Sequence, residues 1–137
     1  MNGYEGLGSL KILHLRRNKI EKIDDEIPEL PALEYLNLRS NKIDNMENLV
    51  KLFQFTTLKD LNVYNCPVER SFSSMNIFVA EILIKNPKLS RFCKVDITDA
   101  HKLEAVFLGK YQFAEAEKKR LALEEEERLK AEAEENG

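Results

Sequence analysis

The sequence has little cysteine and no long apolar run, and both shortages exclude classes of protein. Its two cysteines, Cys66 and Cys93, form no CxxC pair and have no histidine cluster nearby, which argues against a disulfide framework and a zinc site. We therefore expect a reducing compartment, the cytoplasm. No stretch reaches the roughly 18 apolar residues of a transmembrane helix. Lys11 and Arg16 interrupt the first twenty residues, so no secretory signal is expected either.

Charge of one sign is not concentrated in the body of the chain. Through Val95 there are 14 lysines and arginines against 12 aspartates and glutamates, whereas from Asp96 onward there are 7 against 12. The body is thus mildly basic and the tail acidic. A nucleic-acid-binding protein would carry a concentrated basic stripe, so no nucleic-acid partner is expected.

What the sequence does contain is a repeat. Residues 10–20, 33–43 and 58–68 each follow the pattern LxxLxLxx(N/C)x(I/V), at spacings of 23 and 25 residues. Leucine-rich repeats have periods of about 20 to 29 residues, and a mask of this length that recurs three times is specific. The pattern therefore predicts an α/β solenoid, a short leucine-rich-repeat array with a parallel β-sheet.

The pattern also predicts how each repeat folds. Apolar positions such as Leu13 and Leu15 alternate with polar ones, as in a half-buried strand, so stacked repeats would form a parallel sheet over one continuous core. Asn18 and Asn41 are expected to turn inward after the strands and to bond backbone groups that would otherwise be buried unpaired. Cys66 takes that place in the third repeat, as a small buried residue and not a reactive thiol.

A helical cap and then a charged helix should follow the repeats. Ser73 or Ser74 is a suitable N-cap, residues 75–83 carry one apolar helical face, and Asn86-Pro87 ends the helix. Residues 89–95 then repeat a fragment of the mask without its Asn. We expect this unit to cover the core of the last strand. The chain thus divides into leucine-rich repeats at residues 1–70, a C-terminal cap at 71–98 and a charged helical tail at 99–137.

No comparable cap precedes the first strand. Residues 4–10 look like the closing turn of an earlier repeat, so a strand near Leu13 would be an open edge with leucines beneath it. Either the chain is part of a longer repeat protein or a partner covers that end, and we favour the first explanation.

The tail is predicted to be one long α-helix. From Thr98-Asp99 to Glu135 only Gly109 interrupts the helix-forming residues, and about 37 residues would extend about 55 Å. Four apolar residues are expected to dock its first turns onto the cap: Val106, Phe107, Tyr111 and Phe113. Farther along, Leu121, Leu123 and Leu129 show no sustained heptad, so a coiled coil is not established. A solvated helix and a strut gripped by partners both remain open.

The outward residues of the strands form the predicted protein-binding surface. In this architecture they line the concave face, and Tyr and Arg are enriched at interface hot spots. The nine positions form three rows across the sheet: Ile12, Tyr35 and Asp60; His14, Asn37 and Asn62; Arg16, Arg39 and Tyr64.

Nothing in the sequence indicates an enzyme. His14 and His101 lack a companion nucleophile or carboxylate. Gly3, Gly6 and Gly8 follow no predicted strand and precede no Gly-Lys-Ser/Thr, so they form no phosphate loop. We expect no catalytic residue, no metal or other cofactor and no small-molecule substrate.

The motifs LKILHLRRNKIEKID and LEYLNLRSNKIDNMENL resemble the SDS22-like class of leucine-rich repeats, and residues 80–99 resemble the cap of that class. Residues 33–41 and the acidic helix from Ala114 are similar to the leucine-rich-repeat subunit of ciliary radial spokes. This resemblance implies a structural subunit of a ciliary or flagellar axoneme that contacts neighbouring spoke proteins, located in the cytoskeleton. The chain departs from that family in lacking its upstream repeats and in its Tyr64-Asn-Cys66-Pro turn. An axonemal dynein-associated light chain and a phosphatase or nuclear regulatory adaptor are the alternatives.

Overall fold

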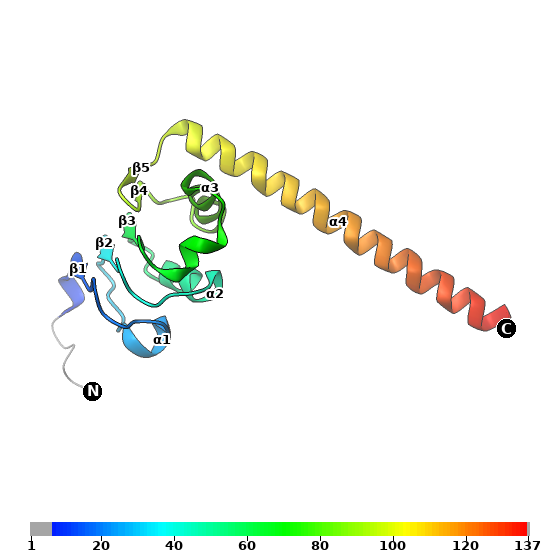
Figure 1. Ribbon diagram of the computed structural model, residues 1–137, viewed down its shortest axis with the longest axis horizontal. Helices are drawn as coiled ribbons and strands as arrows, with labels where there is room; N and C mark the ends of the chain where they lie inside the picture. Colours follow the sequence, from blue (N-terminus) through cyan, green and yellow to red (C-terminus); the bar gives the residue numbers. More distant parts are fainter. Residues whose placement is uncertain (1–6, 137) are drawn as a thin grey trace.

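The computed structural model describes residues 7–136, apart from the side chains of residues 24 and 25. The described residues form a five-stranded sheet whose strands follow one another in chain order. These are β1 (Ile12–His14), β2 (Tyr35–Asn37), β3 (Asp60–Asn62), β4 (Arg91–Phe92) and β5 (Val95–Asp96). The first four strands are parallel, and β5 returns antiparallel to β4. Each parallel step is one unit of the repeat, so the predicted parallel sheet is confirmed (Figure 1).

The same two turns flank each of the first three strands. Before the strand, an N–H bonds back to the carbonyl three residues earlier: Leu10 to Leu7, Leu33 to Leu30 and Leu58 to Phe55, at 3.1, 3.2 and 3.0 Å. The first of these turns contains the 3₁₀ helix η1 (Leu7–Ser9). After the strand, one residue takes a left-handed φ: Arg17, Ser40 and Asn65, at 59°, 60° and 58°. Repetition of both turns brings the short strands into register.

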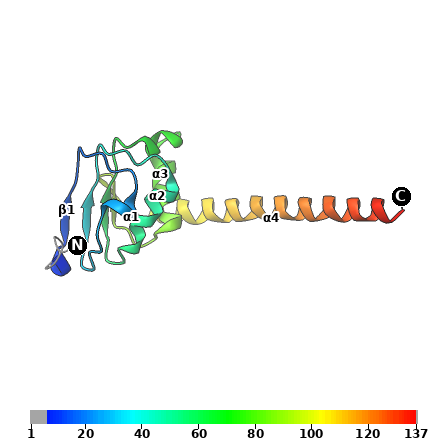
Figure 2. The same cartoon turned by 90° about the horizontal axis from the view of Figure 1, so that it is seen from below.

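The return segments lie together on one side of the sheet (Figures 1 and 2). They contain α1 (Ile23–Glu26), α2 (Met46–Val50), the 3₁₀ helices η2 (Lys51–Gln54) and η3 (Pro67–Ser71), and α3 (Met75–Lys85). The core fills the space between these segments and the sheet, because the inward mask positions are fully buried: Leu36, Leu38, Ile43, Leu61, Val63 and Val68.

The Asn or Cys position of the repeat mask, at the end of each strand, differs between the repeats. Asn41 is buried and bonds the backbone of both its own repeat and the preceding one. Cys66 is also buried, and its thiol donates to the Leu38 carbonyl at 3.2 Å. Asn18, in contrast, is exposed and bonds only the carbonyls of its own turn. The inward position predicted for Asn18 was therefore wrong, because no neighbouring strand covers it among the described residues.

The array is closed by α3 and the β4–β5 hairpin. Ser74 is the N-cap of α3, with its hydroxyl oxygen accepting the Ile77 N–H at 3.3 Å. The buried ring of Phe78 packs edge-on against Phe92, with 4.9 Å between centroids. Two residues with positive φ, Cys93 and Lys94, turn the chain back into β5. Positive φ at both central residues is the usual geometry of a two-residue hairpin.

The last element is α4 (Asp99–Asn136), a single helix of 38 residues, which corresponds to about 57 Å at the rise of an α-helix. It starts beside the cap, packs on α3 and then projects away from the sheet (Figures 1 and 2). Neither α4 nor any other helix in the described part of the chain is apolar enough to cross a membrane.

The face by which α4 docks differs from the predicted one. Ala105 is buried and Gly109 lies against Ile84 of α3, whereas the four residues expected to dock are exposed by 50, 61, 64 and 69%: Val106, Phe107, Tyr111 and Phe113. Small residues occupy the contact because they let the two helices approach closely. The large apolar side chains are left on the outer surface.

We expect Gly109→Ala to raise the free energy of unfolding by about 0.5–1 kcal/mol, because alanine restricts the unfolded chain and favours helix. A Cβ at this position would meet Ile84 Cγ1 at 3.7 Å, an ordinary contact. Urea unfolding followed by circular dichroism measures the change. Ala105→Gly is the reverse control and should destabilise. An unchanged midpoint for both variants would show that α4 does not dock on α3 in solution.

Candidate protein-binding surface

The three predicted rows cross the exposed face of the sheet, opposite the helices. The strand register places Ile12 beside Tyr35 and Tyr35 beside Asp60, and the second row has the same register two residues later. The third row follows directly, because the N–H of Arg17 bonds the carbonyl of Arg39 at 2.9 Å and continues the ladder. The structure thus brings all nine predicted residues together, and their role in binding stays a prediction.

The second row is less accessible than predicted. Asn37 and Asn62 are only 7 and 2% exposed. Their side chains fold back along the strands, and each amide oxygen accepts the N–H two residues on, from Arg39 at 3.0 Å and from Tyr64 at 2.9 Å. Both asparagines therefore stabilise the backbone conformation at the end of their strands. Of this row only His14 is open to a partner.

The third row is the most open. Tyr64 is 46% exposed, and the guanidinium carbon of Arg39 lies 5.2 Å from the centre of its ring. This cation–π contact holds both side chains in one orientation. Arg16 continues the row at the end of β1 and is exposed. A fixed cation over an aromatic ring beside a second, exposed cation favours a partner that offers carboxylates and an apolar surface.

The first row extends farther than the sequence prediction. Arg91 of β4 lies opposite Asp60 in the strand register, and its guanidinium lies 3.5 Å from the carboxylate of Asp96. Burial raises the pKa of Asp60, and the nearby charge of Arg91 partly offsets this increase. Arg91 stands two residues after Leu89, as Tyr35 stands two after Leu33. The mask fragment in the cap could therefore have identified it.

A second exposed surface lies on α4. Leu103, Phe107 and Tyr111 are spaced by four residues and are 55, 61 and 64% exposed. Residues four apart in an α-helix lie on the same side of it, so these three side chains share one face. Beyond residue 113 the helix carries surface ion pairs, such as Arg120 to Glu124 at 2.6 Å, and three exposed leucines without this spacing: Leu121, Leu123 and Leu129. The stretch from Leu103 to Tyr111 is therefore the part of α4 that we expect to contact another protein.

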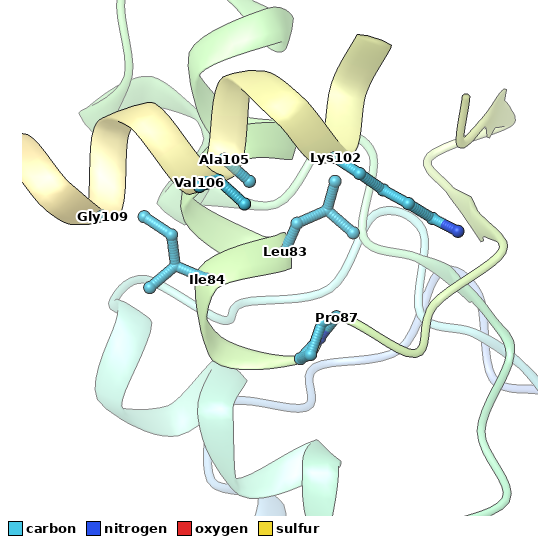
Figure 3. Close-up of a pocket in the computed structure, with 7 residues that line it drawn as sticks. All are labelled: Leu83, Ile84, Pro87, Lys102, Ala105, Val106 and Gly109. Atoms are coloured by element: carbon cyan, nitrogen blue, oxygen red, sulfur yellow. The ribbon is translucent and has the colours of Figure 1, made fainter. Parts of the chain in front are cut away.

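A shallow groove of about 340 Å³ runs along the contact between α3 and α4. Figure 3 shows its lining residues, with Leu83, Ile84 and Pro87 on one side and Lys102, Ala105, Val106 and Gly109 on the other. Its only charged group is Lys102. A binding or active site for a small molecule usually has several converging polar groups, and this groove does not.

Neither thiol is suited to act as a nucleophile. Cys66 and Cys93 are free and buried. Burial raises the pKa of both, that of Cys93 to about 12, so the reactive thiolate is scarce at neutral pH. The described residues also hold no cluster of three or more His, Cys, Asp or Glu that could bind a metal ion.

The repeated strand, turn and return segment are the features on which the comparison with known families depends. Residues 8–66 match the leucine rich repeat family. That region covers β1 to β3 and ends at Cys66, so the match includes the first three strands of the sheet and the return segments between them. No curated protein matches the sequence.

Solved structures extend the likeness past the leucine-rich repeats. A chain of the Drosophila melanogaster SNF/U2A′ complex is similar over 79% of this chain, with a TM-score of 0.63 and 22% identity. A chain of the Chaetomium Mex67:Mtr2 subunits is similar over 70%, with a TM-score of 0.53 and 26% identity. The matches span 63 and 60% of those chains, so this chain spans less than two thirds of either. They show a solenoid-like leucine-rich-repeat fold.

Proposed function

We propose that this chain is a structural protein–protein interaction subunit that binds one neighbour through the concave sheet face and another through α4. The observation that carries the proposal is the open row of Arg16, Arg39 and Tyr64 on the sheet, with α4 projecting from the opposite side of the molecule (Figure 1). Arg and Tyr are among the residue types that dominate interface energies. Two separate surfaces favour a scaffold over a catalyst.

The proposed location is the axoneme of a cilium or flagellum, in a radial spoke. Support comes from the resemblance of residues 33–41 and of the charged helix after the cap to the leucine-rich-repeat subunit of radial spokes. The expected partners are neighbouring spoke proteins. Co-sedimentation of the chain with salt-washed axonemes tests this location, and recovery as a free monomer in the soluble ciliary fraction would contradict it.

The second candidate is a regulatory adaptor that recruits another protein through the same concave face. The similar structures come from a two-component complex and from a pair of subunits, which favours this class. If the concave face bound a phosphatase and the chain did not associate with axonemes, the chain would be a regulatory adaptor. Binding to an axonemal motor-domain fragment would instead support the dynein-associated alternative.

The concave face itself has a direct test. We expect the combined change Arg16→Ala, Arg39→Ala and Tyr64→Ala to weaken binding of an axonemal partner at least about tenfold, because central Arg and Tyr residues each contribute on the order of 2 kcal/mol. Quantitative pull-down from axonemal extract measures the loss. The matched control, Lys42→Ala with Arg70→Ala, removes two exposed cations outside the three rows. Equal binding by both variants would exclude the concave face.

A further inference from the structure

One side of α4 carries a line of positions that are spaced alternately by four and three residues. These positions are Leu103, Phe107, Lys110, Ala114, Glu117 and Leu121. This alternation keeps residues on one stripe of a helix, and it is the spacing by which one α-helix packs along another. The leucines of the tail alone do not show it, because a lysine, an alanine and a glutamate occupy the middle of the line. We call these six positions the α4 seam.

The α4 seam faces away from the body of the protein. Leu103, Phe107 and Leu121 are exposed by 55, 61 and 54%. The residues that dock on α3, Ala105 and Gly109, lie on nearly the opposite side of the helix, and the later turns of α4 extend away from the body (Figures 1 and 2). Because α4 follows β5, at the other end of the sheet from β1, this exposure does not depend on what lies beside β1.

The two halves of the α4 seam differ in chemistry. The half nearer the body begins with two large apolar side chains and ends at Lys110, which forms no ion pair within the described residues. The far half begins at the small Ala114 and continues with Glu117 and Leu121. Beyond it, residues 124–136 contain seven glutamates against two lysines and arginines. An apolar, basic half and a small, acidic half complement each other when two copies of the helix run antiparallel.

We propose that α4 binds a second copy of this chain through the α4 seam, as an antiparallel pair of helices. This inference rests on the function proposed above, because it names the protein that the α4 surface binds. With a two-fold axis beside residue 112, Leu103 lies opposite Leu121 of the second copy, and Lys110 lies within one turn of Glu117 of that copy. Two-fold symmetry repeats each contact. The paired segment, residues 103–121, is about 28 Å long at the rise of an α-helix.

Charge determines the orientation and favours a second copy over other occupants. In a parallel pair in register, Lys110 would lie opposite Lys110 and Glu117 opposite Glu117, and like charges repel. In the antiparallel pair each lysine lies beside a glutamate, at two places. A charged residue within such a seam lowers stability but specifies the register of the helices. A purely apolar occupant would instead bury Lys110 and Glu117 without partners, which is costly.

The molar mass of the full chain in solution tests the pairing. The chain has a mass of 15.9 kDa, and sedimentation equilibrium should give twice this value. Leu121→Ala should raise the dissociation constant of the dimer at least about tenfold, because the buried leucine is lost at two places. Leu123→Ala is the matched control: Leu123 is 59% exposed and lies on the other side of the helix. This variant should dimerise like the unchanged chain.

Charge exchange tests the orientation. Lys110→Glu and Glu117→Lys, each alone, should weaken the dimer at least about tenfold, because each places like charges side by side at two places. The two changes together restore opposite charges, so the double variant should dimerise within about threefold of the unchanged chain. Lys119→Glu makes the same charge change on the side of α4 away from the seam and should have little effect. In a parallel pair both single variants would dimerise like the unchanged chain, since each exchanges one repulsive pair for another.

Three results would overturn the inference: a chain that stays monomeric up to about 0.1 mM, a dimer that Leu121→Ala and Leu123→Ala weaken equally, and a charge-exchanged double variant that stays as weak as the single ones. Pull-down from axonemal extract separates this failure from failure of the proposed function. If the chain is monomeric and only Leu121→Ala loses an axonemal partner, α4 binds a different protein and this inference alone fails. If neither leucine variant changes dimerisation or pull-down, α4 is not a binding surface and both fail.

Discussion

Asn41→Ala is expected to lower the free energy of unfolding by about 1–3 kcal/mol, because a buried polar group left without a partner costs about that much. Asn41 is 3% exposed, and its amide bonds four backbone groups: the Ile20 N–H and the carbonyls of Leu15, Leu38 and Arg39. Alanine leaves the buried Ile20 N–H without its acceptor, whereas the carbonyls of Leu15 and Leu38 keep a second donor, the Asn18 amide and the Cys66 thiol. Urea unfolding at equilibrium measures the loss.

The matched control is Asn18→Ala, the same change one repeat earlier. Asn18 is exposed, and it bonds only the carbonyls of its own turn, which water can solvate after the change. We expect a loss below about 1 kcal/mol, the usual net contribution of one hydrogen bond. Equal losses for the two variants would mean that the bonds of Asn41 across the repeat junction contribute no additional stability.

Phe78→Ala should destabilise the chain by about 3–5 kcal/mol, the cost of removing a fully buried aromatic ring from a core. The Phe78 ring stacks on Phe72 at 4.7 Å and meets Phe92 edge-on at 4.9 Å, so it joins α3 to the last strands of the sheet. Thermal unfolding followed by circular dichroism checks the change. Because the cap covers the end of the array, Leu58 and Leu61 should also lose protection from hydrogen exchange.

Phe113→Ala serves as the control for the cap. Its ring is 69% exposed on α4, so its removal should change the free energy of unfolding by less than about 0.5 kcal/mol. A loss comparable with that of Phe78→Ala would indicate that the first half of α4 contributes to the core in solution.

The parallel sheet could be predicted from the sequence because the positions that specify it lie close together in each repeat. Leu36 and Leu38 alternate with polar residues, and the same mask recurs at a fixed spacing. The alternation within each strand and the stacking of the repeats thus both favour an extended backbone. Accessibility was harder to predict: Asn37 and Asn62 lie on the outward side of their strands, but their amides fold back onto the backbone. Alternation gives the direction of a side chain and not its hydrogen-bond partner.

Two other features depend on contacts that the pattern does not record. The small residues Ala105 and Gly109 form the face of α4 that docks on α3. The sequence prediction chose the large apolar side chains beside them instead. The β4–β5 hairpin turns at Cys93 and Lys94, both with positive φ. Neither residue is a usual turn signal, so the packing of Phe92 and its neighbours must impose the turn.

The hairpin gives the sheet a direction. Because β5 runs antiparallel to β4 and contributes only two residues, ending at the exposed Asp96, the ladder of parallel strands terminates there. At β1 the strand direction matches that of β2 to β4. The two ends of the sheet are consequently not equivalent: the array has a polarity, with a parallel strand at one end and a reversed strand at the other.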